Sequence, residues 1–404
     1  MRLWALASFS AHEAKINRPN FIATNPQFGL ASGPDWPLKI SDCLTRTAYR
    51  GVYSRLNPWG TVNQSHWRET DIGFGGFCMA TLVTGGVGFV GANIVKGLAQ
   101  AGHQVICSDL SEPDQLFMDF LGELSVEVSF AQGDILDQQA VERLGVDYAI
   151  DKIVHAAVFT VNRVELETER SRDVISINLE GTANLLELAR KQRVKRFIYV
   201  SSGAVYGDAN SPDQTLNEDV APAPKQLYGI TKYASELVTR RYGELHGFST
   251  ASVRLSTPYG PMERVTGHRE VMSAFYHWTG QVVRGEAIQP EALEQGRDFT
   301  YVADIVDGIR AILDAPELPH DLYNITAGVW VTLRELLDQL ILLSPATKIM
   351  EPDGGGSKIQ NTGPGRGPLS GHRLFQDLDW TAGYDLNAGL AEYLQWRKDA
   401  PFHD

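Results

Sequence analysis

Short apolar runs alternate with helical patterns along the chain from residue 79 onward. Thr81–Thr84 is apolar and β-branched and leads into a turn, and Val90–Gln100 has the spacing of a helix. This alternation predicts a parallel sheet with helices on both faces, a doubly wound α/β fold. The pattern predicts further strands at Gln104–Asp109, Ser125–Ala131, Lys152–His155, Arg196–Ser201 and Thr250–Leu255, and further helices at Ile177–Arg190 and Tyr228–Leu245.

The same pattern divides the chain into three regions. Residues 1–78 show no sustained periodicity, whereas residues 79–257 carry the alternation of strands and helices. After Pro258 the sequence is richer in Gly, Pro and charge, which predicts a smaller C-terminal domain over residues 258–404, with 297–315 returning to the first domain. Open α/β sheets bind ligands at the carboxyl ends of their strands, so we expect the smaller domain to hold the substrate there.

Two interpretations of residues 1–78 stay open. Met79 stands immediately before the first predicted strand. The upstream region is therefore either the product of a mis-assigned translation start or an arm that packs against the body or a partner.

Composition and charge narrow the function. The net charge of −13 argues against a general nucleic-acid binder. No segment is apolar for long enough to span a bilayer, so we expect no membrane partner. The three cysteines, Cys43, Cys78 and Cys107, form no pair at metal or redox spacing, which favours a reducing, cytoplasmic location and indicates no metal site.

A glycine-rich turn follows the first strand and opens a helix. In Thr84–Gly91, Gly85 permits the tight turn, Gly88 lets the backbone approach a pyrophosphate, and Gly91 lets helix and strand pack closely. The helix start favours the phosphate charge. Asp109 ends the next strand, about 20 residues downstream, where an acid binds the ribose of NAD and repels the extra phosphate of NADP. Together these residues predict a Rossmann domain that binds NAD.

Tyr228 and Lys232 lie four residues apart at the start of a helix and share one face. A free tyrosine has a pKa near ~10, and a neighbouring ammonium lowers it. Tyr228 could then accept the proton of a substrate hydroxyl while hydride leaves for NAD. Ser201 and Ser202 end the strand before it, and a hydroxyl there could hold the substrate oxygen. Taken alone, a Tyr/Lys pair at this spacing is more often a solvated helix face, and a strand-end serine more often bonds to a turn. Here the order of the strands brings the serines and the tyrosine helix to the same edge of the sheet.

At this point the chain resembles a family, the extended short-chain dehydrogenases/reductases, in the branch of UDP-galactose 4-epimerases and nucleotide-sugar dehydratases. The resemblance covers about residues 80–400. It rests on motifs in the family's order: Thr84–Gly91, Asp109, Gly133–Ile135, His155–Ala157, Asn178–Thr182, Val200–Gly207, Tyr228–Lys232, Arg254–Pro261 and Arg297–Asp304.

The resemblance implies roles for individual residues. Ser202, Tyr228 and Lys232 match the catalytic triad. Arg297 matches an arginine that grips the nucleotide diphosphate, and Arg366 would be a second anion contact. The implied substrate contacts are Ser202, Thr257, Arg297 and Arg366. The implied cofactor contacts are Gly85, Gly88, Phe89, Val90, Gly91, Asp109, Asp134, Ile135, Ala156, Ala157, Asn178, Tyr228, Lys232, Thr257 and Pro258, with Asp134 and Ile135 at the adenine.

Several positions depart from the family's pattern. Gly203 and Ala204 stand where dehydratases of this branch carry an Asp-Glu pair, which argues against sugar 4,6-dehydration. Thr257 replaces the usual asparagine before Pro-x-Gly. The loop Met262–Glu270 does not match the expected nucleotide-binding segment, and Glu291–Gln295 replaces a Gly-Asp-Gly. These departures leave the nucleotide linkage of the substrate open.

These motifs and departures leave three functions open. The resemblance favours a nucleotide-sugar epimerase, in which hydride leaves a sugar carbon and returns to its other face. The alternative is an NAD-dependent dehydrogenase of a small polyol, sugar or sugar acid that is not linked to a nucleotide. A non-catalytic NAD-binding module is the third, and the intact set Ser202, Tyr228 and Lys232 speaks against it. We also expect a homodimer, since Ile177–Arg190 and Tyr228–Leu245 match the helices through which the family dimerises.

Overall fold

The computed structural model divides the chain into two units, Met1–Gly73 and Phe74–Asp404. The structure describes residues 79–400 except 125, 162, 208–213, 267–268, 270–271, 291 and 351–365. The interpretations of residues 1–78 lie outside the described residues. The description below concerns the second unit.

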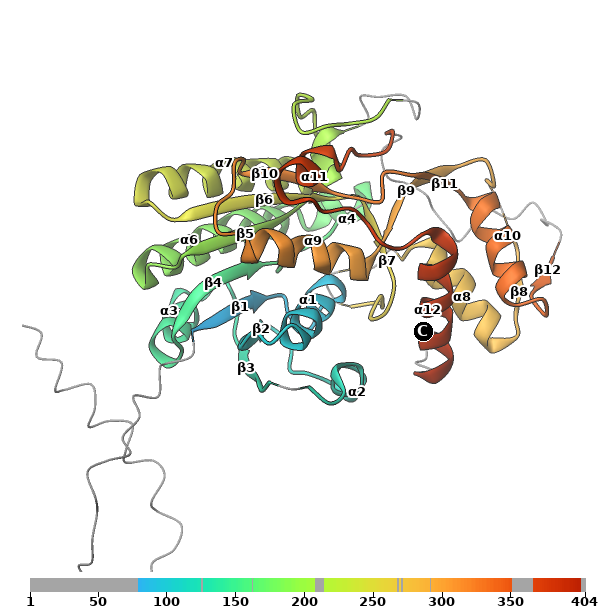
Figure 1. The fold of residues 1–404 in the computed structure, drawn as a ribbon, viewed down its shortest axis with the longest axis horizontal. Coiled ribbons are helices and arrows are strands. Elements are labelled where there is room, and N and C mark those ends of the chain that lie inside the picture. Colours follow the sequence, from blue (N-terminus) through green and yellow to red (C-terminus); the bar gives the residue numbers. More distant parts are fainter. Residues whose placement is uncertain are drawn as a thin grey trace, which may run out of the picture. The chain divides into compact units, whose positions relative to one another are not determined.

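Seven parallel strands form the main sheet, in the order β3-β2-β1-β4-β5-β6-β10 (Figure 1). The chain starts in the middle of the sheet and winds outward in both directions, so the predicted doubly wound Rossmann fold is confirmed. The strands are β1 (Ala80–Thr84), β2 (Val105–Asp109), β3 (Val128–Gln132), β4 (Ile150–His155), β5 (Arg196–Ser202), β6 (Ser249–Leu255) and β10 (Leu322–Ile325).

Helices cover both faces of this sheet and create two apolar cores. Leu82 and Val83 are adjacent on β1 and are both fully buried, because successive side chains of a strand point to opposite faces. Val83 belongs to the core under α1 (Phe89–Gln100) and α9 (Val302–Asp314). Leu82 belongs to the core on the other face, under α3 (Gln138–Asp147), α6 (Gly181–Gln192) and α7 (Leu227–His246). A strand buried on both faces reads as a continuous apolar run, as the sequence does here.

The helix predicted at Ile177–Arg190 begins differently from the prediction. Residues Ser176–Glu180 form one π-helical segment, η2, ahead of α6. The carbonyl of Asn178 in this segment accepts hydroxyl hydrogen bonds from Thr182 at 2.6 Å and from Ser235 at 2.9 Å. The π-helical segment is closed by the backbone amide of Gly181, which donates to the carbonyl of Ser176. Short helices α4 (Val164–Glu169) and α5 (Ser171–Ile175) precede it.

The C-terminal part builds a core of its own. Tyr259 and Phe275 stack there with ring centroids 4.0 Å apart, and Trp278 is fully buried beside them. Figure 1 shows the helices of this part grouped beyond the edge of the main sheet. Its elements are β7 (Thr257–Tyr259), α8 (Ala274–Arg284), β8 (Ala287–Ile288), β9 (Gly296–Tyr301), β11 (Trp330–Thr332), α10 (Leu333–Leu343), β12 (Lys348–Ile349) and α12 (Leu386–Asp399).

The chain passes between the two parts more than once. Strand β9 pairs with β7 and β11 in a three-stranded sheet, and α9, which follows it directly, packs against α1. Strand β10 then joins the main sheet beside β6. The remaining helices are α2 (Gln115–Leu121) and α11 (His372–Leu378), with the 3-10 turn η3 (Gly203–Tyr206) after β5.

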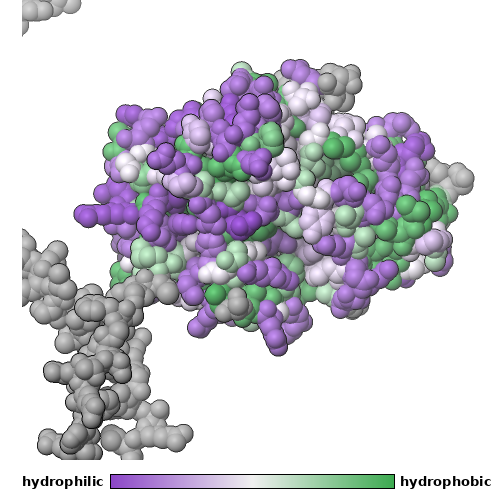
Figure 2. Space-filling view, in the orientation of Figure 1, coloured by the Kyte–Doolittle hydropathy of each residue, from purple (hydrophilic) through white to green (hydrophobic). Residues whose placement is uncertain are grey.

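The visible face mixes polar and apolar residues (Figure 2). Apolar colour gathers at the edge where Figure 1 places α10 and β12, and Leu342 and Met350 there are 66% and 53% exposed. Within the part of the chain that the structure describes, no helix combines the length and apolarity needed to cross a membrane.

Candidate active site

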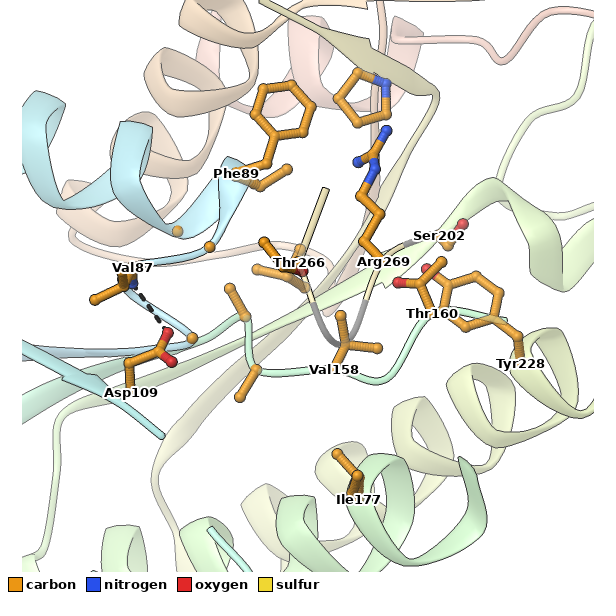
Figure 3. Close-up of a pocket in the computed structure, with 18 of the residues that line it drawn as sticks. Val87, Phe89, Asp109, Val158, Thr160, Ile177, Ser202, Tyr228, Thr266 and Arg269 are labelled. Carbon is orange, nitrogen blue, oxygen red and sulfur yellow. Dashed lines mark hydrogen bonds between the residues drawn. The ribbon is translucent and has the colours of Figure 1, made fainter. Parts of the chain in front are cut away.

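One cavity of about 720 Å³ opens along the carboxyl ends of the strands. It lies where β1 and β4 are neighbours and the winding reverses direction, the usual ligand position in such sheets. Asp109 lies at one end of the close-up, and Ser202 and Tyr228 lie at the other (Figure 3). The predicted site residues that line it are Gly85, Gly88, Phe89, Val90, Gly91, Asp109, Asp134, Ile135, Ala156, Ala157, Ser202, Tyr228, Lys232, Thr257, Pro258, Arg297 and Arg366.

The glycine turn brings the backbone against the cavity. Gly85 has φ +68°, and a Cβ there would meet the backbone nitrogen of Ala157 at 2.6 Å. A Cβ at Gly91 would lie 1.9 Å from the carbonyl oxygen of Gly85. Gly88, which has no side chain, is the N-cap of α1. The first-turn amides therefore face the cavity without a side-chain cap and can bind a phosphate.

Asp109 is held against this turn by two backbone amides. Val87 donates to its Oδ2 and Ser111 donates to its Oδ1, both at 3.0 Å (Figure 3). Each carboxylate oxygen keeps a further lone pair for a ribose hydroxyl. The glycine turn, this acid, and Ile135 and Ala156 along the wall fit a dinucleotide such as NAD.

At the other end of the cavity, Tyr228 lies beside Ser202 and Thr160 (Figure 3). Burial raises the pKa of Tyr228. A hydrogen bond with Ser202 and the charges of Arg269 and Arg366 act in the opposite direction and lower it. Burial outweighs these contributions, so the pKa of Tyr228 stays above its ordinary value, and the hydrogen bond and the two charges limit the rise. The phenol lies at the position where a substrate hydroxyl would give up its proton.

Lys232 lies one helical turn beyond Tyr228, and its side chain is directed inward. Its Nζ donates to the carbonyl of Val200 at 2.6 Å and lies 5.9 Å from the ring centre of Tyr228. Burial lowers the pKa of Lys232 to about 7, while the carboxylate of Glu236 raises it. The spacing of four residues thus places an ammonium beside the tyrosine ring, with its charge sustained by Glu236.

The partners of Glu236 were missed by sequence reasoning. Its carboxylate accepts a hydrogen bond from Ser201 and two from Arg254, at 3.0 and 2.7 Å. Glu236 is 5% exposed and Arg254 is 1% exposed. The only sequence signal was an acid on the buried side of the tyrosine helix, four residues after Lys232.

Two motif residues lie in the protein interior with structural contacts. Asn178 is not among the residues that line the cavity; it bonds the backbone of Phe159 and the hydroxyl of Thr231. His155 bonds the hydroxyls of Thr84 and Thr182, and burial lowers its pKa to about 3. Asn178 and His155 therefore stabilise the packing of the sheet and helices around the cavity.

Four arginines line the cavity: Arg264, Arg269, Arg297 and Arg366. Burial and the charge of Arg366 lower the pKa of Arg297 to about 10. Two positive charges that oppose each other in this way are stabilised by an anionic ligand.

Arg269 comes from the loop whose sequence did not match the expected segment. Its guanidinium lies 5.1 Å from the ring centre of Phe89 and donates to Glu263 at 2.8 Å. Glu263 is fully buried and also accepts from Ser273. Apart from the charges of the loop, no sequence pattern indicated that Arg264 and Arg269 line the cavity.

The chain matches known proteins along most of its length. The model of the NAD dependent epimerase/dehydratase family matches residues 81–326. The protein CapI of Staphylococcus aureus is 31% identical over 345 residues, 79% of this chain and 98% of CapI. The dTDP-D-glucose 4,6-dehydratase of Homo sapiens is 27% identical over 347 residues, 82% of this chain and 93% of that enzyme. The structure of the Thermus thermophilus UDP-glucose 4-epimerase in complex with NAD is 26% identical, covers 79% of this chain and 99% of its own, and has a TM-score of 0.65.

Proposed function

The chain belongs to the NAD-dependent epimerase/dehydratase family and is an NAD-dependent enzyme, and from this premise we propose that it is a nucleotide-sugar epimerase. The observation that carries the proposal is one cavity with the glycine turn and Asp109 at one end and Ser202 with Tyr228 at the other. A relative of known structure that shares this fold is a UDP-glucose 4-epimerase with NAD.

The residues of the cavity would move one proton. Tyr228 takes the proton from the sugar hydroxyl, and Ser202 holds the same oxygen through a hydrogen bond. The charges of Arg269 and Arg366, and the ammonium of Lys232 5.9 Å from the ring centre, would favour the phenolate during this step. The glycine turn and Asp109 would hold NAD, which would supply reversible hydride transfer at the carbinol carbon. Tyr228 then gives its proton back to the oxygen, so no net redox change remains.

Two observations favour epimerisation of a nucleotide sugar over related reactions. Gly203 and Ala204 offer no acid or base beside Ser202, so the elimination step of a dehydratase has no proton donor there. Arg297 lines the cavity, and its guanidinium fits the negative charge of a nucleotide diphosphate. A neutral polyol or sugar presents no anion to such an arginine.

Cofactor retention tests this proposal first. The protein is purified without added cofactor and denatured, and the released NAD(H) is quantified. We expect near-stoichiometric NAD(H), because an epimerase regenerates NAD within each cycle. UDP-sugars are then incubated with the protein and their epimers separated by chromatography. An empty protein that forms NADH from polyols or sugar acids would favour the dehydrogenase instead.

Tyr228→Phe is the matched variant, because it removes only the hydroxyl. We expect turnover to fall by about 1,000-fold with the bound NAD(H) unchanged. Wild-type turnover in this variant would contradict the proton path.

We further propose a cytoplasmic homodimer. On α7, Ile230, Leu237 and Leu245 are 42%, 44% and 56% exposed. Their spacing places them near one side of the helix, where a second copy of the chain would cover them.

A further inference from the structure

The guanidinium of Arg366 packs against the residue that follows Ser202. A Cβ added at Gly203 would meet Nη2 of Arg366 at 3.0 Å and its Nε at 3.2 Å. Gly203 is buried, and its φ is not in the left-handed region, so backbone conformation does not explain the glycine. The missing side chain instead leaves the space that the guanidinium occupies.

This position is at the reacting end of the cavity. Gly203 follows Ser202 directly, and consecutive Cα atoms are about 3.8 Å apart. The guanidinium therefore packs one residue away from the hydroxyl that would hold the substrate oxygen. The charge of Arg366 also reaches Tyr228, where it offsets part of the rise in pKa that burial causes. In a hexose, the anomeric carbon with its nucleotide lies across the ring from the carbon at position 4. A guanidinium beside Ser202 is therefore close to the substituents next to a reacting carbon at that position.

Resting on the proposed function, we propose that Arg366 binds a carboxylate on the exocyclic carbon of the sugar, so that the substrate is a nucleotide-linked uronic acid. The exocyclic carbon is attached to the ring carbon beside position 4. A guanidinium binds a carboxylate through two parallel hydrogen bonds, a geometry that a neutral hydroxymethyl group does not match.

The charges around Arg366 agree with two anionic groups in the ligand. Arg366 and Arg297 both line the cavity, and the charge of Arg366 lowers the pKa of Arg297. The diphosphate places negative charge at the anomeric end of a sugar nucleotide, and a uronic acid adds a carboxylate at the other end of the sugar. Asp298 also feels the charge of Arg366; its Oδ2 accepts hydrogen bonds from Thr326 and from the amide of Leu369, and its buried Oδ1 accepts none within the described part of the chain.

The test compares epimerisation of UDP-glucuronate with that of UDP-glucose, with the dTDP-linked pair run in parallel. We expect the wild-type kcat/KM to favour the glucuronate by about 100-fold. Arg366→Gln is expected to lower kcat/KM for the glucuronate by about 100-fold relative to that for glucose, which abolishes the preference of the wild type. Arg297→Gln is the matched control, and we expect it to lower both by a similar factor.

A second variant tests the same contact without removing the charge. Gly203→Ala pushes the guanidinium away by a few tenths of an ångström, so we expect a loss of roughly tenfold for the glucuronate alone. Retained NAD(H) and the thermal midpoint show whether each variant is folded.

The outcomes separate this inference from the proposed function. A wild-type preference for glucose, or an equal loss for both sugars in Arg366→Gln, would overturn the inference and leave the epimerase standing. Conversion of none of the four sugar nucleotides by a protein that holds NAD(H) would overturn the proposed function itself.

Discussion

At the scale of single residues, buried polar groups determine how the fold responds to pH. His155 is 1% exposed, and its ring nitrogens bond Thr84 at 2.7 Å and Thr182 at 3.0 Å. Burial, with a contribution from Lys232, lowers its pKa from 6.5 to about 3. The folded protein therefore holds His155 neutral at a pH where the unfolded chain takes up a proton.

The stability of the fold should fall as the pH drops below 6.5. Between pH 7.5 and pH 5, this one group is expected to cost about 2 kcal/mol of unfolding free energy. Urea unfolding at the two pH values measures it, with His155→Gln as the reference because the other titrating groups are common to both proteins. An equal pH dependence in the two proteins would mean that His155 is protonated in the fold.

A second residue-scale prediction concerns the buried pair of Glu236 and Arg254. Glu236→Gln leaves the guanidinium in the interior without its carboxylate, so we expect the unfolding free energy to fall by about 3–5 kcal/mol. The exposed pair Arg240–Asp321 is the control, and Asp321→Asn is expected to cost at most about 1 kcal/mol. Chemical denaturation measures the unfolding free energy of both variants. Similar losses would show that breaking the buried Glu236–Arg254 pair destabilises the fold no more than breaking an exposed pair.

At the scale of elements, the start of α1 couples packing to cofactor binding. The Cβ of an alanine at Gly91 would lie 1.9 Å from the carbonyl oxygen of Gly85, which is backbone and cannot rotate away. The helix must then move off the turn that presents its amides to the phosphate.

Gly91→Ala should therefore reduce the NAD(H) that copurifies with the protein by roughly tenfold or more. We also expect the unfolding free energy to fall by about 2 kcal/mol. Gly371→Ala is the control, since a Cβ there meets its nearest atoms, in Thr326, only at 3.6 Å. Full NAD(H) occupancy in the Gly91 variant would argue that the turn does not hold the phosphate.

Also at the scale of elements, the apolar periodicity predicts most helices and strands but not every helix start. Most predicted strands and helices agree with the structure to within a few residues, because each repeats its apolar positions locally. The apolar pattern did not predict the π-helical start at Ser176–Glu180, where the carbonyl of Asn178 accepts hydrogen bonds from the hydroxyls of Thr182 and Ser235. Those partners come from other turns and another helix.

At the scale of the whole molecule, α7 serves the site with one side and is exposed on the other. Lys232 and Glu236 face inward, while Leu237 is 44% exposed. A symmetric dimer would bring a substitution at Leu237 into the interface twice. The proposed dimer therefore has a simple test.

Leu237→Arg should convert a dimer of the 44.6 kDa chain into monomers, measured by light scattering after size exclusion. Leu342→Arg is the comparison, because Leu342 is 66% exposed in the smaller part of the fold. Dissociation by the Leu342 substitution alone would place the interface on α10 instead of α7.

The sequence by itself determined the doubly wound sheet, the glycine turn, Asp109 and the pair Tyr228–Lys232. These features follow from local rules: apolar alternation, the glycine that a tight turn needs, and the four-residue spacing of a helix face. The order of the strands then brings the ends of β1, β2 and β5 to one edge of the sheet.

Only the tertiary structure decided which distant side chains meet at that edge. Arg366 lies against Gly203, more than 160 residues earlier in the chain, and Arg269 lies against Phe89. Asn178, which the motif assigned to the cofactor, is placed in the interior by Phe159 and Thr231. No period or spacing encodes such contacts, because they depend on how separately folded segments pack and on the space that one missing side chain leaves for another.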